Sequence, residues 1–386
     1  GVCRIEGCPH LSDVDSAADI LRYLGCAVQW DGDDLLVDST TLTRCDIPQT
    51  LMRRMRSSVI FLGAILARCG EASLTSPGGC ELGPRPIDLH LSGLRALGAE
   101  IDDTGGTLHC KAAKLTGREI VLGFPSVGAT ENLMLAACGA EGVTVLSNAA
   151  REPEIEDLQG FLNTCGAEIT GAGTSTVVIR GGRPLHGGTY TILPDRIAAA
   201  TYLCGAASAG GEVFLRDARE EHLSAVTAVL REAGCDVTGG SAGIVCRRTG
   251  RLTAPRPIRT APYPGFPTDA QAILMAALLR CRGAAVFEEN LFSSRYRHVD
   301  ELARMGADIR VSGRTAVVLG VERLHGAAVR CTDLRGGAAL CAAALAAEGE
   351  TSISDITHID RGYQSIEDDL AALGADIRRV EETASP

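Results

Sequence analysis

The sequence predicts an α/β fold of two similar domains, each made of three copies of one supersecondary unit. Three observations carry this prediction: a glycine-terminated helix that recurs along the chain, an apolar helix ahead of it, and an alternating strand behind it. The glycines are Gly25, Gly98, Gly166, Gly234, Gly306 and Gly374, at intervals of 73, 68, 68, 72 and 68 residues. Such regular spacing is typical of a repeated structural unit.

The glycine-terminated helix is amphipathic, as in residues 91–97 ahead of Gly98. We expect each glycine to adopt the left-handed conformation just past the helix end, because that conformation costs little only without a Cβ atom. Residues 100–103 and 308–311 then alternate polar and apolar side chains, which predicts a strand after the turn.

A second, strongly apolar helix precedes the glycine-terminated one in repeats two to six. The predicted ranges are 55–67, 127–137, 196–207, 270–279 and 338–347. The first repeat has only 24 residues ahead of Gly25, which predict a strand over 2–5 and a helix over 14–24. We expect this repeat to lack its opening strand and buried helix and, because no Met begins the chain, interpret the sequence as the product of a truncated reading frame.

The length of 386 residues exceeds that of one ordinary core, so the six repeats divide most simply into two domains. The boundary falls between the third and fourth repeats, which gives a first domain over residues 1–193 and a second over 194–386.

Composition excludes several classes of function. Apolar residues make up 45% of the chain, but no apolar run is long enough to span a membrane. The net charge is −11 and there is no Lys/Arg-rich run, so we expect neither a nucleic-acid nor a membrane partner. The 15 cysteines lack metal-type spacing. Most lie in apolar segments, which favours reduced core cysteines in a cytoplasmic protein with no metal and no cofactor.

Cys80 is the exception, because it lies in a loop rich in glycine and proline between residues 76 and 90. We expect this loop to be accessible to solvent, and Arg85 nearby would favour the thiolate. An incidental exposed cysteine in a turn is the alternative.

The chain resembles the enolpyruvyl transferase family. The resemblance rests on Pro-Gly-Gly-Cys at 77–80, Gly-Pro-Arg-Pro-Ile-Asp-Leu-His at 83–90 and further motifs at 125–130, 148–154, 193–196, 266–269, 332–335 and 358–363. These motifs cover nearly the whole chain in the family's order. The implied fold is an inside-out α/β barrel of two similar domains, each with three βαβαββ units, that closes on its substrates.

The resemblance implies transfer of the enolpyruvyl group from phosphoenolpyruvate to the 3′-hydroxyl of UDP-N-acetylglucosamine, the first committed step of peptidoglycan synthesis. The hydroxyl attacks C2 of phosphoenolpyruvate while C3 is protonated, and phosphate then leaves. Asp269 matches the carboxylate that orients the hydroxyl and accepts its proton, although a helix N-cap is the plain alternative. Cys80 matches the cysteine that adds to phosphoenolpyruvate, is linked to proton donation and is alkylated by fosfomycin.

The resemblance also implies a set of substrate-binding cations. Arg56, Arg85 and Arg361 match positions around phosphoenolpyruvate and the nucleotide sugar, where guanidinium groups form forked bonds to oxyanions. Asp333 and Arg335 match an Asp-Leu-Arg motif near the reacting carbons, and an ion-paired helix N-terminus is the alternative. Taken singly, each arginine is more often part of a surface ion pair. The substrate-binding positions further include Arg295 and Leu291, the latter contacting the sugar nucleotide.

The nucleotide is expected at two segments of the first domain. Ser126, Val127 and Gly128 begin a helix after a proline, which presents backbone N–H groups to a diphosphate. The segment that contacts uridine is matched by Arg85, Pro86, Ile87, Asp88 and Leu89. Glu152 and Asp195 resemble acidic positions that we interpret as structural.

The sequence departs from the family in two places. A Lys-Asn pair in the first repeat, which binds the phosphate and the sugar, has no counterpart here, and neither Lys111 nor Lys114 is placed to replace it. Gly336 and Gly337 are expected to loosen a helix start.

Three hypotheses therefore stand: the UDP-sugar enzyme, a sister enzyme acting on a shikimate-type hydroxyl, and a catalytically silent paralogue that binds a UDP-sugar. Cys80 and the uridine-type segment argue against the second.

Overall fold

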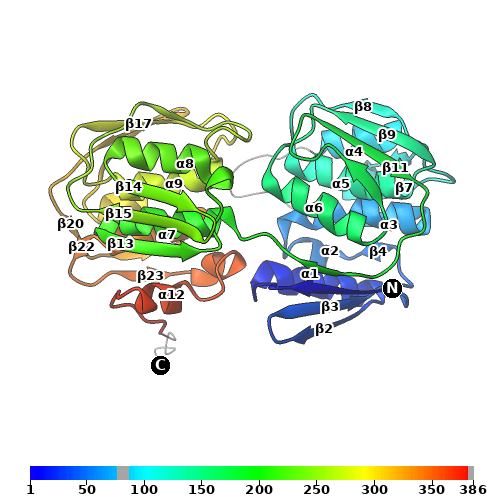
Figure 1. Cartoon of the computed structure of the whole chain (residues 1–386), viewed down its shortest axis with the longest axis horizontal. Helices are drawn as coiled ribbons and strands as arrows, with labels where there is room; N and C mark the ends of the chain where they lie inside the picture. Colours follow the sequence, from blue (N-terminus) through cyan, green and yellow to red (C-terminus); the bar gives the residue numbers. More distant parts are fainter. Residues whose placement is uncertain (76–86, 381–386) are drawn as a thin grey trace. The chain divides into compact units, whose positions relative to one another are not determined.

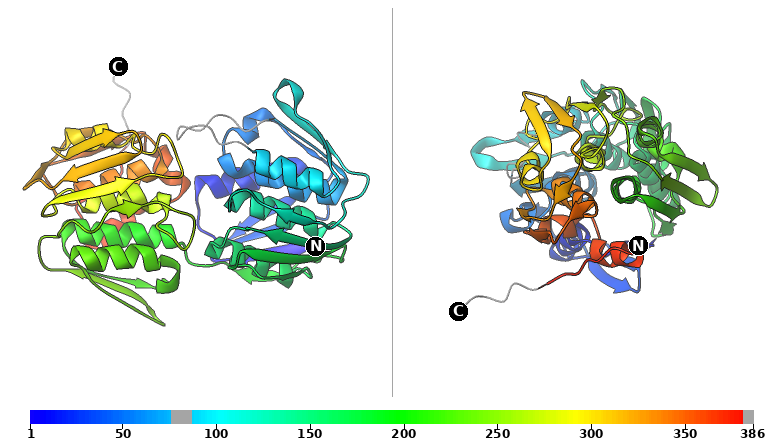
Figure 2. Two further views of the ribbon diagram at one scale, coloured as in Figure 1. Left: turned by 90° about the horizontal axis from the view of Figure 1, so that it is seen from above. Right: turned by 90° about the vertical axis from the view of Figure 1, so that its left-hand side faces the viewer.

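The chain forms two compact units, residues 1–193 (unit 1) and residues 194–386 (unit 2). This computed structural model describes residues 1–75 and 87–380, and Figure 1 labels their elements. Each unit contains β-sheets packed against α-helices, as Figure 2 shows. Within the described residues, no helix combines the length and the apolar character needed to cross a bilayer.

Unit 1 contains three four-stranded sheets. The first has the order β12 (Thr189–Thr191), β1 (Val2–Glu6), β3 (Asp34–Asp38) and β2 (Ala27–Asp31), with helix α1 (Ser12–Leu24). The second has the order β4 (Asp46–Ile47), β5 (Glu71–Thr75), β7 (Thr107–Lys111) and β6 (Glu100–Asp102), with α2 (Gln49–Met52), α3 (Phe61–Cys69), α4 (Asp88–Ala96) and the 3₁₀ turns η1 (Arg56–Ile60) and η2 (Thr104–Gly106). The third has the order β10 (Glu168–Thr170), β11 (Thr176–Gly181), β9 (Gly142–Ser147) and β8 (Glu119–Val121), with α5 (Val127–Cys138) and α6 (Pro153–Thr164).

Unit 2 repeats this plan with smaller sheets. Its first sheet has the order β13 (Gly211–Arg216), β15 (Gly243–Arg248) and β14 (Asp236–Gly240), with α7 (Arg196–Ala209) and α8 (Glu220–Ala233). The next has the order β16 (Ile258–Arg259), β17 (Ala284–Glu288), β19 (Thr315–Leu319) and β18 (Asp308–Ser312), with α9 (Thr268–Ala277) and α10 (Val299–Arg304). The last repeat has the pairs β20 (Leu324–His325) with β22 (Ala347–Glu348) and β21 (Ala328–Arg330) with β23 (Ser352–Ser354), together with α11 (Leu334–Ala344), η3 (Ile356–Arg361) and α12 (Ile366–Ala372).

The strand pairing explains the βαβαββ repeat. In the complete repeats, the first strand runs parallel to the second, and the hairpin formed by the last two strands joins the second strand antiparallel. A parallel pair requires a crossover, which the buried helix supplies. In the first sheet, β12 runs parallel to β1 and takes the edge that β4 and β8 occupy in their sheets. That edge is therefore paired, although the first repeat has no opening strand of its own in this sequence.

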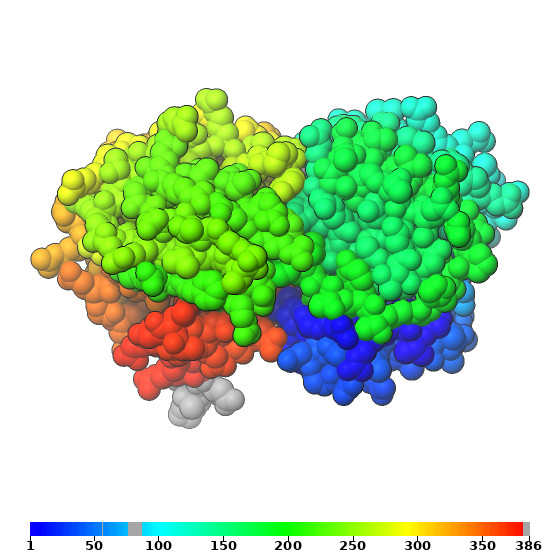
Figure 3. Space-filling model, in the orientation of Figure 1, coloured from blue at the N-terminus to red at the C-terminus, as the bar shows by residue number. Residues whose placement is uncertain are grey.

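Alanine-rich helices form the interior of unit 2. Helices α7, α9 and α11 pack directly on one another, and most of their residues are buried. Their small side chains allow close approach, while leucine, isoleucine and phenylalanine from the sheets complete the core. In unit 1, α3 and α5 pack on each other and form the corresponding part of the interior. In the space-filling view of Figure 3, the early strands and α8 (green) give unit 2 a continuous outer surface on the side shown.

The prediction for the six glycines is confirmed, because all of them have φ between 91° and 108°. The helix ranges expected from the sequence mostly agree with those in the structure, but the first and last residues of some helices differ. Residues 56–60 form a 3₁₀ turn rather than the first turn of an α-helix. Helix α11 begins at Leu334 because the Asp333 side chain caps it. No strand follows Gly374 within the described residues.

The expectation that Gly336 and Gly337 loosen a helix is wrong. Both lie buried inside α11. A Cβ atom on Gly337 would lie 2.7 Å from Cγ1 of Ile359 and 2.9 Å from Sγ of Cys331. These glycines therefore allow α11 to pack closely against its neighbours.

Candidate active site

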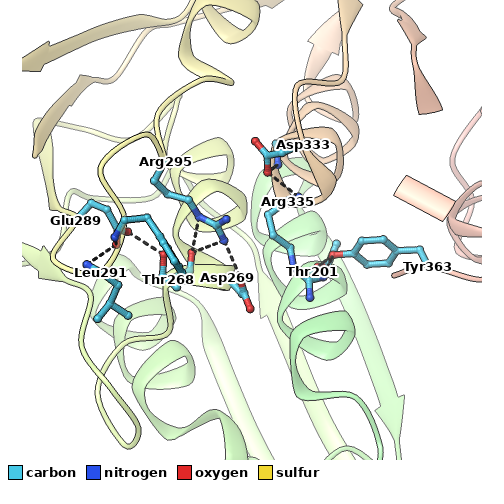
Figure 4. A network of polar contacts seen from close by, with 11 residues as sticks. Thr201, Thr268, Asp269, Glu289, Leu291, Arg295, Asp333, Arg335 and Tyr363 are labelled. Carbon is cyan, nitrogen blue, oxygen red and sulfur yellow. Dashed lines mark hydrogen bonds and ion pairs between the residues drawn. The ribbon is translucent and has the colours of Figure 1, made fainter. Parts of the chain in front are cut away.

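Asp269 and Arg295 form the centre of a polar cluster in unit 2, shown in Figure 4. Nη2 of Arg295 lies 2.7 Å from Oδ1 of Asp269. The same guanidinium donates to the carbonyl of Thr268 from Nε and Nη2, at 3.2 and 3.0 Å. The side chain of Arg295 is 2% exposed and that of Asp269 is 46% exposed. A buried guanidinium thus fixes a carboxylate that remains open to solvent or a ligand.

The helix N-cap that we considered for Asp269 is not what the structure shows. Pro267 occupies the N-cap position of α9, and no side chain caps that helix end. Asp269 lies in the first turn, where a carboxylate is favoured by the helix dipole. Its position is set by Arg295 instead.

Glu289 is bonded to this cluster through Thr268. Oε2 of Glu289 accepts a hydrogen bond from Oγ1 of Thr268 at 2.9 Å, while Oε1 accepts from the backbone N–H groups of Leu291 and Phe292 at 2.8 and 3.0 Å. Glu289 is fully buried. Its carboxylate therefore joins the start of α9 to the segment that carries Leu291, so that Leu291 and Asp269 belong to one bonded network (Figure 4).

Asp333 and Arg335 lie at the start of α11. Oδ1 of Asp333 accepts hydrogen bonds from the N–H groups of Arg335 and Gly336, both at 3.0 Å, which is a helix N-cap. Burial on its own would lower the pKa of the Arg335 guanidinium, but Tyr363, Asp269 and Asp195 outweigh it and raise the pKa above its usual value. This cation therefore stays charged beside the phenol of Tyr363 and in the field of the carboxylates of Asp269 and Asp195.

Tyr363 anchors the Arg335 side chain. Its hydroxyl accepts from Nη1 of Arg335 at 3.1 Å and lies 2.6 Å from Oγ1 of Thr201 in α7. Burial raises the pKa of Tyr363. Arg361 ends the turn η3, two residues before Tyr363. Hydrogen bonds thus join Thr201 of α7, Arg335 at the start of α11 and Tyr363 just after η3. Asp195 caps α7 through the N–H groups of Ile197 and Ala198, as its structural interpretation requires.

In unit 1, Ser126 caps α5, because its Oγ accepts from the N–H of Ala129 at 3.3 Å. Val127 and Gly128 form the first turn that follows. Ile87 stands at the N-cap position of α4, with Asp88 and Leu89 in its first turn. The two helix starts are neighbours, since a Cβ atom on Gly128 would lie 3.3 Å from Cε1 of His90. Ile87, Asp88 and Leu89, expected to contact the uridine, therefore lie near the segment expected to bind the diphosphate.

The remaining predicted residues cannot be placed. Cys80, Arg85 and Pro86 lie outside the described residues, and so does the side chain of Arg56 at the start of η1. Among the residues that are described, no group of His, Cys, Asp and Glu side chains is arranged to hold a metal ion.

Comparison with known proteins identifies the class to which this two-unit fold belongs. The EPSP synthase (3-phosphoshikimate 1-carboxyvinyltransferase) family matches residues 1–370. The chain belongs to this family.

Curated relatives of this chain carry names that specify one reaction within the family. The chain is 50% identical over 380 residues to UDP-N-acetylglucosamine 1-carboxyvinyltransferase 2 of Caldanaerobacter subterraneus subsp. tengcongensis, covering 98% of this chain and 91% of the relative. It is 47% identical over 395 residues to UDP-N-acetylglucosamine 1-carboxyvinyltransferase of Rhodospirillum centenum, covering 99% and 91%.

Solved structures agree on the fold. The enolpyruvyl transferase NikO from Streptomyces tendae matches with a TM-score of 0.86 and 26% identity, over 98% of this chain and 90% of that one. EPSP synthase from Acinetobacter baumannii matches with a TM-score of 0.72 and 18% identity, over 96% and 90%. The inside-out α/β fold expected from the resemblance is therefore confirmed.

Sequence reasoning missed the residues that hold the site together. Thr268 and Tyr363 lie within the family motifs at 266–269 and 358–363, but no role was predicted for them. No role was predicted for Glu289 or Thr201 either. The available signal for Glu289 was an acidic residue directly after the apolar segment that forms β17, because a buried Glu requires partners.

Proposed function

We propose that this protein transfers the enolpyruvyl group of phosphoenolpyruvate to the 3′-hydroxyl of UDP-N-acetylglucosamine and releases phosphate. The observation that carries the proposal is the open carboxylate of Asp269, fixed at 2.7 Å by the buried Arg295. A positioned carboxylate of this kind can orient a hydroxyl and accept its proton. Relatives at about half identity are named for this reaction.

In this scheme, the sugar hydroxyl attacks C2 of phosphoenolpyruvate and loses its proton to Asp269, while C3 gains a proton. The resulting adduct then loses a proton from C3, and the C2–O bond to phosphate breaks. We assign proton delivery at C3, and reaction with fosfomycin, to Cys80. The cations Arg335, Arg361, Arg56 and Arg85 are assigned to the carboxylate and phosphate groups, because guanidinium pairs bidentately with both.

Asp333 contributes in this proposal by holding the start of α11, and hence the backbone of Arg335, in a fixed place. Leu291 is assigned to the sugar and is held in place by Glu289, and Arg295 supports this part by fixing Thr268 and Asp269. Ser126, Val127 and Gly128 receive the diphosphate at the helix start of α5, and Ile87, Asp88 and Leu89 contact the uridine. The proposal places the reaction in the cytoplasm, as a step of peptidoglycan synthesis.

The direct test measures phosphate release from phosphoenolpyruvate with each acceptor. We expect release that depends on UDP-N-acetylglucosamine and equals the enolpyruvyl ether formed. Release that depends instead on shikimate 3-phosphate would assign the chain to the sister reaction. Binding of UDP-N-acetylglucosamine by calorimetry without any turnover would support the silent paralogue.

A further inference from the structure

Asn132 lies in the middle of α5, fully buried, and its side chain joins three separate segments of unit 1. Oδ1 accepts a hydrogen bond from the backbone N–H of Gly63 at 2.6 Å. Nδ2 donates to the carbonyl of Val59 at 3.1 Å. A backbone N–H can only donate and a carbonyl can only accept, so these two contacts fix which end of the amide is oxygen and which is nitrogen.

The orientation of Asn132 then determines the state of His90. Nδ2 of Asn132 lies 2.9 Å from Nδ1 of His90. Because the amide nitrogen is a donor, Nδ1 must accept and carries no proton. His90 is 7% exposed. Burial lowers its pKa to about 4, although Asp88 opposes this effect. The ring is therefore neutral at physiological pH, with its one proton on Nε2.

Nε2 of His90 faces the first turn of α5. A Cβ atom on Gly128 would lie 3.5 Å from Nε2 and 3.3 Å from Cε1, so the ring edge lies directly against this turn. Nδ1 is engaged by Asn132, whereas Nε2 has no hydrogen-bond partner among residues 1–75 and 87–380. This donor is placed beside the backbone N–H groups of a helix start, which favour anions.

Two glycines make this arrangement possible. A Cβ atom on Gly63 would lie 2.2 Å from the backbone oxygen of Asn132 and 2.4 Å from Oδ1, so any other residue would push α3 away from α5. Gly128 likewise leaves room for the imidazole at the start of α5. The position of the ring is thus built into the packing of both helices.

We infer that Asn132 locks His90 in the Nε2–H tautomer, and that this N–H donates to a phosphate oxygen of the nucleotide at the start of α5. His90 is then a ligand-binding residue and Asn132 a positioning residue that acts through it. The identification of the ligand as a nucleoside diphosphate rests on the proposed function. The tautomer does not depend on that function.

The ligand part is tested by calorimetry with UDP and with uridine on the full chain. His90→Leu removes the donor, so UDP should bind about tenfold to a hundredfold more weakly, as for a lost bond to a charged group, while uridine binding should change little. His90→Gln should retain most of the UDP affinity, because its amide oxygen can accept from Asn132 while its nitrogen donates. His109→Gln is the control, because His109 is exposed on β7 and bonds only to Ser73 among the described residues.

The tautomer part is tested by NMR of ring-¹⁵N-labelled histidine, assigned by comparison with His90→Gln. We expect His90 to carry its proton on Nε2 alone in the unaltered chain, and both tautomers to be populated in Asn132→Leu, with thermal unfolding confirming that the variant is folded. A proton on Nδ1 in the unaltered chain, or equal UDP affinity in His90→Leu, would overturn the inference. If the unaltered chain binds no UDP at all, the proposed function and the ligand part both fail, and the NMR result decides the tautomer by itself.

Discussion

The guanidinium of Arg295 and the carboxylate of Asp269 are 2.7 Å apart, yet the first is 2% exposed and the second 46%. This difference in exposure gives Arg295 a supporting role and Asp269 the reactive one. Arg295 also donates from Nε and Nη2 to the carbonyl of Thr268, whereas the side chain of Asp269 is about half exposed. A carboxylate fixed in this way loses little entropy when a hydroxyl approaches it.

Removing the carboxylate should therefore affect rate more than stability. We expect Asp269→Asn to lower the turnover number by about 10²–10⁴-fold, the usual contribution of a general base. The free energy of unfolding should fall by about 1–3 kcal/mol, because the buried guanidinium of Arg295 loses its charged partner but keeps the amide oxygen as an acceptor. Phosphate release and urea unfolding measure the two quantities. A variant with full turnover would remove Asp269 from the mechanism.

Cys80 is predicted to be the site of fosfomycin alkylation. Mass spectrometry of the intact chain should show one adduct, and Cys80→Ser should show none. Cys69→Ser is a suitable control, because Cys69 is an exposed thiol at the end of α3, and this variant should still be modified. An unchanged adduct mass in Cys80→Ser would contradict the assignment.

Thr268 is predicted to matter for the sugar-binding segment through Glu289. Thr268→Val removes the hydroxyl that donates to Oε2 of Glu289 at 2.9 Å and leaves a buried carboxylate oxygen with fewer partners. We expect a loss of about 1–3 kcal/mol in unfolding free energy. We also expect a higher KM for UDP-N-acetylglucosamine and an unchanged KM for phosphoenolpyruvate. Equal increases in both KM values would argue against a role confined to the Leu291 segment.

Two buried histidines should make the fold sensitive to acid. Burial lowers the pKa of His90 and of His298 to about 4, against an ordinary value of 6.5. The unfolded chain therefore binds more protons than the folded one between these values. Stability should be fully present above about pH 6.5 and fall as pH drops toward 4, by up to about 3 kcal/mol for each histidine. Thermal unfolding across this range measures the slope.

A variant distinguishes this effect from general acid denaturation. His90→Gln should flatten the slope between pH 6.5 and 4, while His109→Gln should leave it unchanged, since His109 is exposed. Identical slopes in the unaltered chain and in His90→Gln would show that His90 is not the group responsible.

The sequence predicted what depends on local chemistry. The six helix-ending glycines follow from the cost of a Cβ atom at positive φ, and Ser126 follows from the preference of short polar side chains for helix starts. Repetition then indicated the supersecondary unit. These signals lie within a few residues of one another, so no knowledge of long-range packing was needed.

The contacts that shape the candidate site depend on packing between segments distant in sequence. Arg295 reaches Asp269 across 26 residues, Tyr363 reaches Thr201 across 162, and Asn132 reaches Gly63 across 69. Each of these residues resembles an ordinary polar residue in the sequence. Only the packing of α9, α7 and α5 against their neighbours determines which partner each one meets.

The pairing of β12 with β1 affects how unit 1 folds during synthesis. Thr189 pairs with Arg4 in the first sheet, and the hydroxyl of Thr191 bonds to Glu6 across 185 residues. During synthesis, the edge of β1 that β12 covers in the folded unit stays without β12 until almost the whole of unit 1 has emerged. Loop closure over that distance slows folding, and an open edge invites pairing with other chains. Nascent chains that stall before Thr189 should therefore be the species most in need of chaperones.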